Sequence, residues 1–228
     1  MERGLYIAAS GMLAEQARQD LIAHDLANAS TPGYKPDRVA SKSFGEMLLH
    51  DTRSGNTIGG LGLGTQIDKQ VTDTSPGPLR DTGEPLDFAV EGGGFFAVKT
   101  PAGVRYTRDG QFSASSRGTL VTAAGDDVLG PGGAPVRIGA DGHVAAAAIG
   151  VVALTNPRRQ GDTLFTGTAA GAAPGTVRPG AIEASAVDPV HTMVEMLGSL
   201  RAFESGQRVI TTIDSTLAKA ANQVGSDR

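Results

Sequence analysis

The chain has 228 residues, of which 39% are hydrophobic and 19% charged, and its formal net charge is -4. This balance excludes a highly charged disordered chain and a cationic nucleic-acid-binding protein. The sequence contains no Cys, so disulfides and thiolate metal sites are excluded. No apolar run reaches the ~18 residues that a membrane-spanning helix needs, so we expect no membrane insertion.

Gly and Pro are unevenly distributed along the chain. Its 32 Gly and 12 Pro concentrate between residues 32 and 185, whereas both ends contain few. Because Gly and Pro interrupt regular structure, the ends predict helices and the middle predicts short strands joined by turns. We therefore expect four segments: an N-terminal helix at 1–35, an extended connection at 36–85, a β-rich domain at 86–184 and a long C-terminal helix at 185–228.

The N-terminal segment has helical periodicity. Residues spaced alternately three and four positions apart form a stripe, and we expect Asn28 and the turn at 31–33 to end the helix. Two polar residues at stripe positions lower the stability that this helix would have alone. The stripe consists of Leu5, Ala8, Met12, Glu15, Gln19, Ile22 and Leu26.

The middle of the chain has the pattern of a β domain. Short β-rich pieces between residues 86 and 129 alternate with Gly-containing turns, of which 91–94 and 109–110 are typical of hairpins. We expect further strands at 135–138, 143–147, 150–154 and 163–165. The stretches 44–79 and 166–180 are interpreted as long connections between the β domain and the helical ends.

The C-terminal segment predicts one long helix. Asp188 is a suitable N-cap, and Pro189 suits the first helical position because its missing N–H has no partner there. A heptad stripe then continues without a slip, and we predict that it forms a self-assembly seam with Leu5, Ala8, Met12, Ile22 and Leu26. Its members are Met193, Met196, Leu200, Phe203, Gln207, Ile210, Asp214, Leu217, Ala221 and Val224.

Pairing of the two ends is the simplest way to bury both stripes, since neither is wide enough to form a stable helix in isolation. The predicted fold class is therefore α+β, with N- and C-terminal helices paired as a coiled-coil-like layer and a Gly-rich all-β middle domain. Gln207 and Asp214 leave two interpretations open. They either restrict the register of the helices or face solvent where the stripe drifts.

Known catalytic patterns are missing from the sequence. The four His residues are isolated, the Gly-rich run at 59–64 lacks the Lys of a phosphate-binding loop, and no nucleophile elbow occurs. The adjacent carboxylates Asp126 and Asp127 would point to opposite faces of a strand. We expect no enzyme activity, no cofactor and no metal site.

Three ordered blocks resemble the axial rod and hook proteins of the bacterial flagellum. They lie at 4–12 with 26–35, at 86–98 with 106–130, and at 185–188 with 201–204. The chain departs from that family's usual pattern at His24, Asp25, Ala186 and Phe203, and it is short for a hook protein. The matching motif residues are Asn28, Thr31, Pro32, Gly33, Tyr34, Lys35, Gly92, Gly94, Phe95, Phe96, Tyr106, Thr107, Arg108, Gly110, Phe112, Val187, Asp188, Arg201, Ala202 and Glu204.

The resemblance implies a structural subunit of the basal-body rod, of proximal or distal type, with a hook-type assembly protein as the alternative within the same family. Such a subunit would polymerise helically into a hollow drive shaft, with its terminal helices inside and its β domain outside. The expected partners are copies of itself, other rod and hook subunits, the flagellar type III export apparatus and, as further candidates, the surrounding basal-body rings. The expected location is the rod outside the inner membrane, reached without a cleaved signal peptide.

Two alternatives from other classes remain open at this point. A fibre-like adhesin or phage tail component would also combine a coiled coil with a Gly-rich β head, but it would assemble as a closed trimer. An enzyme acting on cell-wall glycan would need a close carboxylate pair or a metal site.

Overall fold

The computed structural model describes residues 2–43, 46–50, 57–62 and 64–225 and divides them between two compact units. Unit 1 comprises Met1–Leu26, Asp37–Val71 and Val190–Arg228, and unit 2 comprises Ala27–Pro36 and Thr72–Pro189. Residues 1, 44–45, 51–56, 63 and 226–228, which belong to the predicted helical ends and connection, lie outside the described residues.

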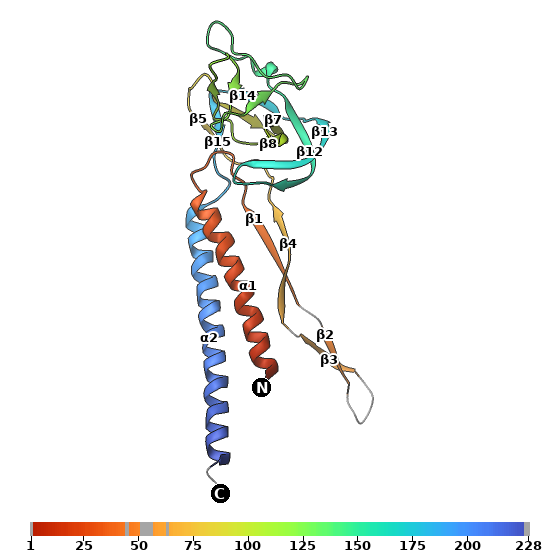
Figure 1. The fold of residues 1–228 in the computed structure, drawn as a ribbon, viewed down its shortest axis with the longest axis vertical. Helices are drawn as coiled ribbons and strands as arrows, with labels where there is room; N and C mark the ends of the chain where they lie inside the picture. Colours follow the sequence, from red (N-terminus) through yellow and green to blue (C-terminus); the bar gives the residue numbers. More distant parts are fainter. Residues whose placement is uncertain (1, 44–45, 51–56, 63, 226–228) are drawn as a thin grey trace. The chain divides into compact units, whose positions relative to one another are not determined.

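Unit 1 is built from two long helices and two strand pairs (Figure 1). Helix α1 covers Glu2–Ala27, and helix α2 covers Pro189–Gly225 and begins at the Pro that the sequence predicts. The stretch interpreted as an extended connection contains β1 (Asp37–Ser43), β2 (Glu46–His50), β3 (Thr57–Gly62) and β4 (Thr65–Thr72). Strand β1 pairs with β4, and β2 pairs with β3 in antiparallel register.

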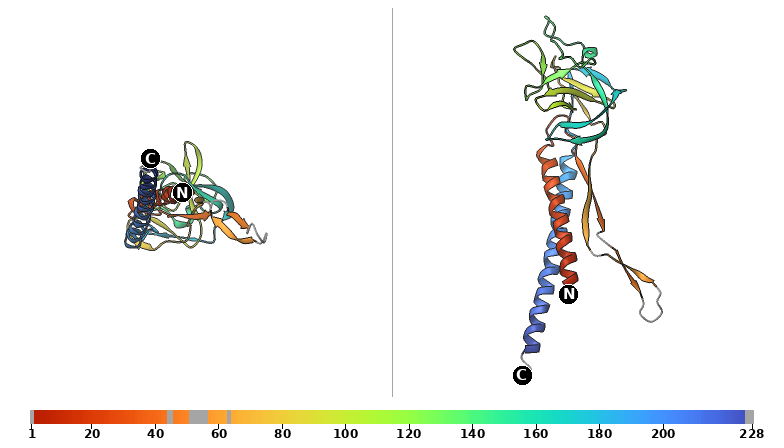
Figure 2. Two further views of the ribbon diagram at one scale, coloured as in Figure 1. Left: turned by 90° about the horizontal axis from the view of Figure 1, so that it is seen from below. Right: turned by 45° about the vertical axis from the view of Figure 1, so that its right-hand side comes forward.

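Unit 2 is a β domain whose main sheet has seven strands in the order β12-β13-β8-β7-β11-β10-β9. Strand β12 also pairs with β7, so that β12, β13, β8 and β7 close into a ring. Figure 2 shows the fold from two further sides. Two further pairs, β14 with β6 and β15 with β5, complete the unit. The bounds are β5 Leu79–Asp81, β6 Phe88–Glu91, β7 Phe95–Thr100, β8 Gly103–Thr107, β9 Ser113–Ala114, β10 Leu120–Val121, β11 Asp127–Leu129, β12 Val151–Arg159, β13 Leu164–Ala172, β14 Thr176–Pro179 and β15 Ala181–Glu183.

The core of unit 2 is formed by aromatic and β-branched side chains from the short strands. Phe96 packs edge-on against Phe112 with ring centroids 5.3 Å apart, and Phe88 lies 6.3 Å from Phe112. Such tilted contacts between rings are favourable beyond the area that they bury. The buried cluster contains Phe88, Val90, Phe96, Val98, Phe112, Leu120, Val128, Val136, Val144 and Ile149.

Several predicted strands take another form. The stretch 135–138 makes only isolated bridges to Leu129 and Thr119, and 143–147 runs into a short 3₁₀ helix, η1 (Ala146–Ala148). In contrast, most of the predicted connection at 166–180 consists of β13 and β14. Small and Gly-rich sequences form these strands because their backbones pair with β12 and β6, which local propensity does not reveal.

Candidate self-assembly surface and its buried anchor

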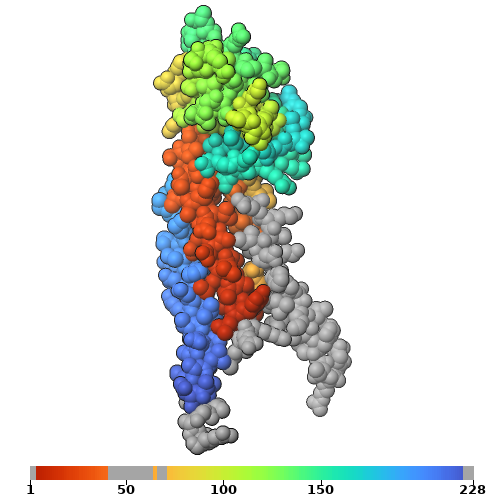
Figure 3. Space-filling model, viewed as in Figure 1, coloured from red at the N-terminus to blue at the C-terminus, as the bar shows by residue number. Residues whose placement is uncertain are grey.

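Helices α1 and α2 run antiparallel and approach closely. The Ser199 hydroxyl donates to a Glu15 carboxylate oxygen at 2.6 Å, and Gly206 faces Met12, where an added Cβ would lie 2.7 Å from the Met12 Cγ. Farther along the pair, an added Cβ on Gly4 of α1 would lie 3.4 Å from the Cδ1 of Ile213 on α2. The space-filling view shows the two helices in contact along α1 (Figure 3). Small residues on α2 therefore allow close packing of the pair.

The covered face of α2 has a regular heptad spacing. Its members are buried or half-buried, and they alternate between small or polar residues and large apolar ones over the first part of the helix. The face is only one stripe of residues wide, and three of its members are small or polar, so it stabilises the pair only modestly. The members are Thr192, Met196, Ser199, Phe203, Gly206, Ile210, Ile213 and Leu217.

The predicted C-terminal seam is divided between two faces of α2. Four of its members, Met196, Phe203, Ile210 and Leu217, lie on the covered face. Its other described members are exposed, and the side chain of Val224 lies outside the described part of the chain. The exposed members are Met193, Leu200, Gln207, Asp214 and Ala221.

The members of the predicted N-terminal seam are buried or half-buried on α1. Ile22 is buried, and Leu5, Ala8, Met12 and Leu26 are half-buried. The outer side of the same helix exposes large apolar side chains at Tyr6, Ile7 and Leu13.

An exposed apolar stripe covers the first three turns of α2. Five large hydrophobic side chains are exposed there: Val190, Met193, Val194, Leu197 and Leu200. We call this surface the α2 outer stripe. A contiguous apolar surface of this kind is typical of sites where a protein contacts a partner.

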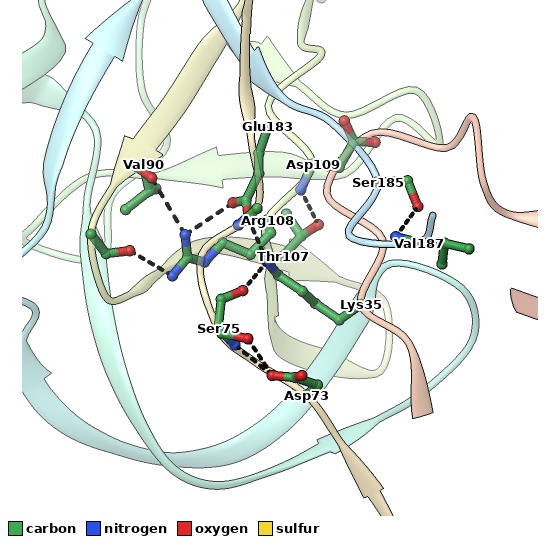
Figure 4. A network of polar contacts seen from close by, with 12 residues as sticks. Lys35, Asp73, Ser75, Val90, Thr107, Arg108, Asp109, Glu183, Ser185 and Val187 are labelled. Carbon is green, nitrogen blue, oxygen red and sulfur yellow. Dashed lines mark hydrogen bonds and ion pairs between the residues drawn. The ribbon is translucent and has the colours of Figure 1, made fainter. Parts of the chain in front are cut away.

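A buried ionic cluster lies in unit 2, where the two segments that lead to the helices meet (Figure 4). The Lys35 ammonium donates to a Glu183 carboxylate oxygen and to the Ser75 carbonyl, the latter at 2.6 Å. The Gly77 N–H donates to the same Glu183 oxygen at 2.6 Å. Lys35 and Glu183 are fully buried, so their charges are compensated by each other and by backbone groups instead of water.

Arg108 completes this cluster from the end of β8. Its guanidinium donates to the second Glu183 oxygen at 2.9 Å and to the Gly92 carbonyl at 2.8 Å, and it lies over the Phe95 ring at 5.2 Å. Its Nε is buried without a hydrogen-bond partner among the described residues. One carboxylate thus serves two buried cations, and we call Lys35, Arg108 and Glu183 the ionic triad.

Burial changes the ionisation of two groups in this region. Desolvation lowers the pKa of Lys35 from its ordinary value, and the Glu183 carboxylate opposes that shift. Burial raises the pKa of Asp109, while the hydrogen bond from the Gln111 N–H opposes the rise. In both cases removal from water disfavours the charged form.

Backbone contacts join the segments that carry the triad. The Gly33 N–H donates to the Glu183 carbonyl at 2.8 Å, and the Ala186 N–H donates to the Tyr34 carbonyl at 3.1 Å. Gly33 has a φ of +67°, and a Cβ there would lie 2.3 Å from the Arg108 backbone, so only Gly fits. The chain after α1 and the chain before α2 are therefore fastened to each other within unit 2.

The structure brings most of the motif residues into this region or into the adjacent core. Tyr34 is buried beneath the Arg159 guanidinium, which lies 5.0 Å from its ring centroid. Gly110 fits against Phe88, where a Cβ would lie 1.5 Å from the carbonyl oxygen. The motif residues Arg201, Ala202 and Glu204 instead lie exposed on α2.

Other motif residues have local roles. Thr31 donates through its hydroxyl to the Asn28 side chain at 3.1 Å, Thr107 Oγ1 accepts from the Asp109 N–H at 3.0 Å, and the Val187 N–H donates to Ser185 Oγ at 3.3 Å. The remaining ones are Pro32, Gly94 and Tyr106, which are half-buried or buried, and the exposed Asp188.

Sequence reasoning missed Glu183, the residue at the centre of the triad. It lies in the apolar strand β15, and its partners are 75 and 148 positions away along the chain. The available signal was the position of this Glu between the apolar residues Ile182 and Ala184. A Glu in such a strand is fully buried only when it is paired with another group, so its position indicates a buried partner.

Neither a metal site nor a membrane-spanning helix is found in the described part of the chain. Within it, no group of three or more His, Asp or Glu side chains could hold a metal ion. No helix among the described residues combines the length and apolar character needed to cross a membrane.

Comparison with known proteins gives matches along the whole chain. Three family models match: a flagella basal body rod protein model at 5–35, a flagellar hook protein FlgE/F/G D1 domain at 89–151, and a flagellar basal body rod FlgEFG protein C-terminal model at 178–224. The flagellar basal-body rod protein FlgG of Bacillus subtilis is 32% identical, and the match covers 97% of this chain and 99% of the relative. FlgF of Caulobacter vibrioides is 30% identical over 99% of both chains.

Proposed function

The chain belongs to the family of flagellar basal-body rod proteins, and we propose that it is a structural subunit that polymerises helically into the rod. The rod would form a hollow shaft that transmits torque and through which exported subunits pass. Its terminal helices would form the inner layer, with the β domain as the outer layer.

The α2 outer stripe is the observation that carries this proposal. Complete burial of one such side chain stabilises an interface by about 1.5–3 kcal/mol. These side chains are about half-exposed in the single chain, so burial of the exposed half of each would contribute roughly half of that free energy. A single contact between two copies would therefore be modest. A polymer repeats it many times, which makes assembly cooperative and distributes torque over many small contacts.

The family membership supports further proposals about partners and location. We expect contacts with other rod and hook subunits and with the surrounding rings of the basal body. Delivery would occur through the flagellar type III export apparatus without a cleaved signal peptide, to the rod outside the inner membrane. A second candidate, a closed trimer of the adhesin type, is not favoured because the relatives are named as rod proteins.

Substitution of Leu200 by Asp tests the proposal. Leu200 is exposed in the single chain, so Leu200→Asp should leave the unfolding of the monomer unchanged. It should raise the concentration needed for sedimentable assembly at least tenfold and abolish motility of cells that produce the variant. Val104→Asp, at an exposed Val on β8, is the matched control and should assemble normally. Normal assembly by Leu200→Asp would contradict the proposal.

A further inference from the structure

The outer face of α1 carries a stripe that matches the α2 outer stripe in spacing. Tyr6, Ala9, Leu13 and Gln16 are exposed, and they follow one another at intervals of three, four and three residues. On α2, the exposed Leu200, Leu197, Met193 and Val190 have the same intervals when read against the chain direction. Two helices with matching stripes of this period can pack in antiparallel register.

We propose that this α1 outer face of one copy packs on the α2 outer stripe of a second copy, in the register that places Tyr6 opposite Leu200 and Leu13 opposite Met193. The inference rests on the proposed function, since it specifies which surfaces meet when the chain assembles. In this register the small Ala9 faces Leu197, so a large side chain meets a small one at the centre of the contact.

The sizes and exposures of these side chains fit an interface between copies. The exposed fractions are 61% for Tyr6, 68% for Leu13, 51% for Met193, 54% for Leu197 and 43% for Leu200. Hydrophobic residues exposed to this degree on both surfaces lose apolar contact with water when the surfaces meet. The covered faces of both helices remain occupied by their partner within the same chain.

The proposed contact cannot be made within one chain, because α1 and α2 already pair in another register. Within the chain Glu15 lies against Ser199, whereas the proposed register places Glu15 level with His191. The two registers differ by eight residues at the Glu15–Ser199 contact and by twelve at the Met12–Gly206 contact, which corresponds to a shift of about 12–18 Å along the helices at 1.5 Å per residue.

A contact between two different surfaces has a consequence for the type of assembly. Each copy would offer one α1 outer face and one α2 outer stripe, so each can bind two neighbours. Contacts of this head-to-tail kind, combined with an axial shift, continue into an open helical polymer and do not close into a dimer. The shift of about 12–18 Å is therefore an expected axial component of the displacement between contacting copies.

Disulfide trapping tests the register, and the absence of Cys from the chain gives each variant a single thiol. Leu13→Cys protein is mixed with Met193→Cys protein under conditions of assembly, oxidised, and analysed for the mixed disulfide dimer. Every such bond joins two copies, and it requires Cα atoms within about 7 Å. Val209→Cys, at an exposed position of the same helix, replaces Met193→Cys in the matched control.

We expect at least tenfold more mixed dimer with Met193→Cys than with Val209→Cys, and the same preference for Tyr6→Cys mixed with Leu200→Cys. Sedimentable assembly without this preference, or with a dominant Leu13→Cys homodimer, would overturn the inference and leave the proposed function intact. Failure of the unmodified chain to assemble at all would overturn both.

Discussion

Replacement of Glu183 by Gln should destabilise unit 2 by about 3–5 kcal/mol, because it leaves buried cations without their counter-charge. The Glu183 carboxylate accepts hydrogen bonds from Lys35, from Arg108 at 2.9 Å and from the Gly77 N–H at 2.6 Å. A Gln keeps the shape but removes the charge and turns one acceptor into a donor. At least one of these three donors would then face an N–H group.

Urea unfolding followed by near-ultraviolet circular dichroism, which reports on the packed Phe and Tyr rings of unit 2, would measure the loss. Glu84→Gln, at an exposed position, is the matched control and should change stability by less than about 0.5 kcal/mol. Addition of Lys35→Met to Glu183→Gln should recover part of the loss, because it removes one unpaired cation. Wild-type stability of Glu183→Gln would refute the assignment of the triad as an anchor.

Three further predictions concern other features of the chain. Gly33→Ala should lower the free energy of unfolding in urea by at least about 2 kcal/mol more than Gly83→Ala does. Both Gly have positive φ, but only a Cβ at Gly33 would meet the Arg108 backbone. Equal losses of unfolding free energy in the two variants would contradict this. The pKa of Asp109 is raised, so its contribution to stability is present below the unfolded value of 3.8 and is lost as the pH rises through the folded pKa. Asp109→Asn should therefore stabilise the protein at pH 7 but not at pH 3.5, and an equal effect at both pH values would count against burial as the cause. In the isolated monomer, hydrogen exchange should be fast throughout α1 and α2 and slow in the core strands of unit 2, because the helix pair buries a narrow face; strong protection along both helices would show that they need no partner.

The helices were predictable from the sequence because their signals are local. Pro189 marks the start of α2, and the three-four spacing of apolar residues runs through the helix that follows. The side that packs on α1 was harder to predict, because the covered face includes Thr192, Ser199 and Gly206. Close approach of two backbones favours small residues, whereas a search for large apolar side chains selects Met193 and Leu200 on the neighbouring exposed side.

The ionic triad could be predicted only in part. Lys35 and Arg108 belong to motif residues found by resemblance, but nothing local indicates that either is buried. Their shared partner Glu183 comes from a distant strand, and the pairing depends on how the segment after α1 lies beside β15. Such contacts are set by tertiary structure, which is also why β13 and β14 form where the sequence indicated a connection.

An electron cryo-microscopy reconstruction of a rod assembled from this chain would show directly whether the α2 outer stripe is an interface between copies. We expect α1 and α2 of successive copies to form a continuous inner layer in which the α2 outer stripe is buried. A rod whose copies meet through the strands of unit 2 alone, with Met193 and Leu200 left in solvent, would contradict it.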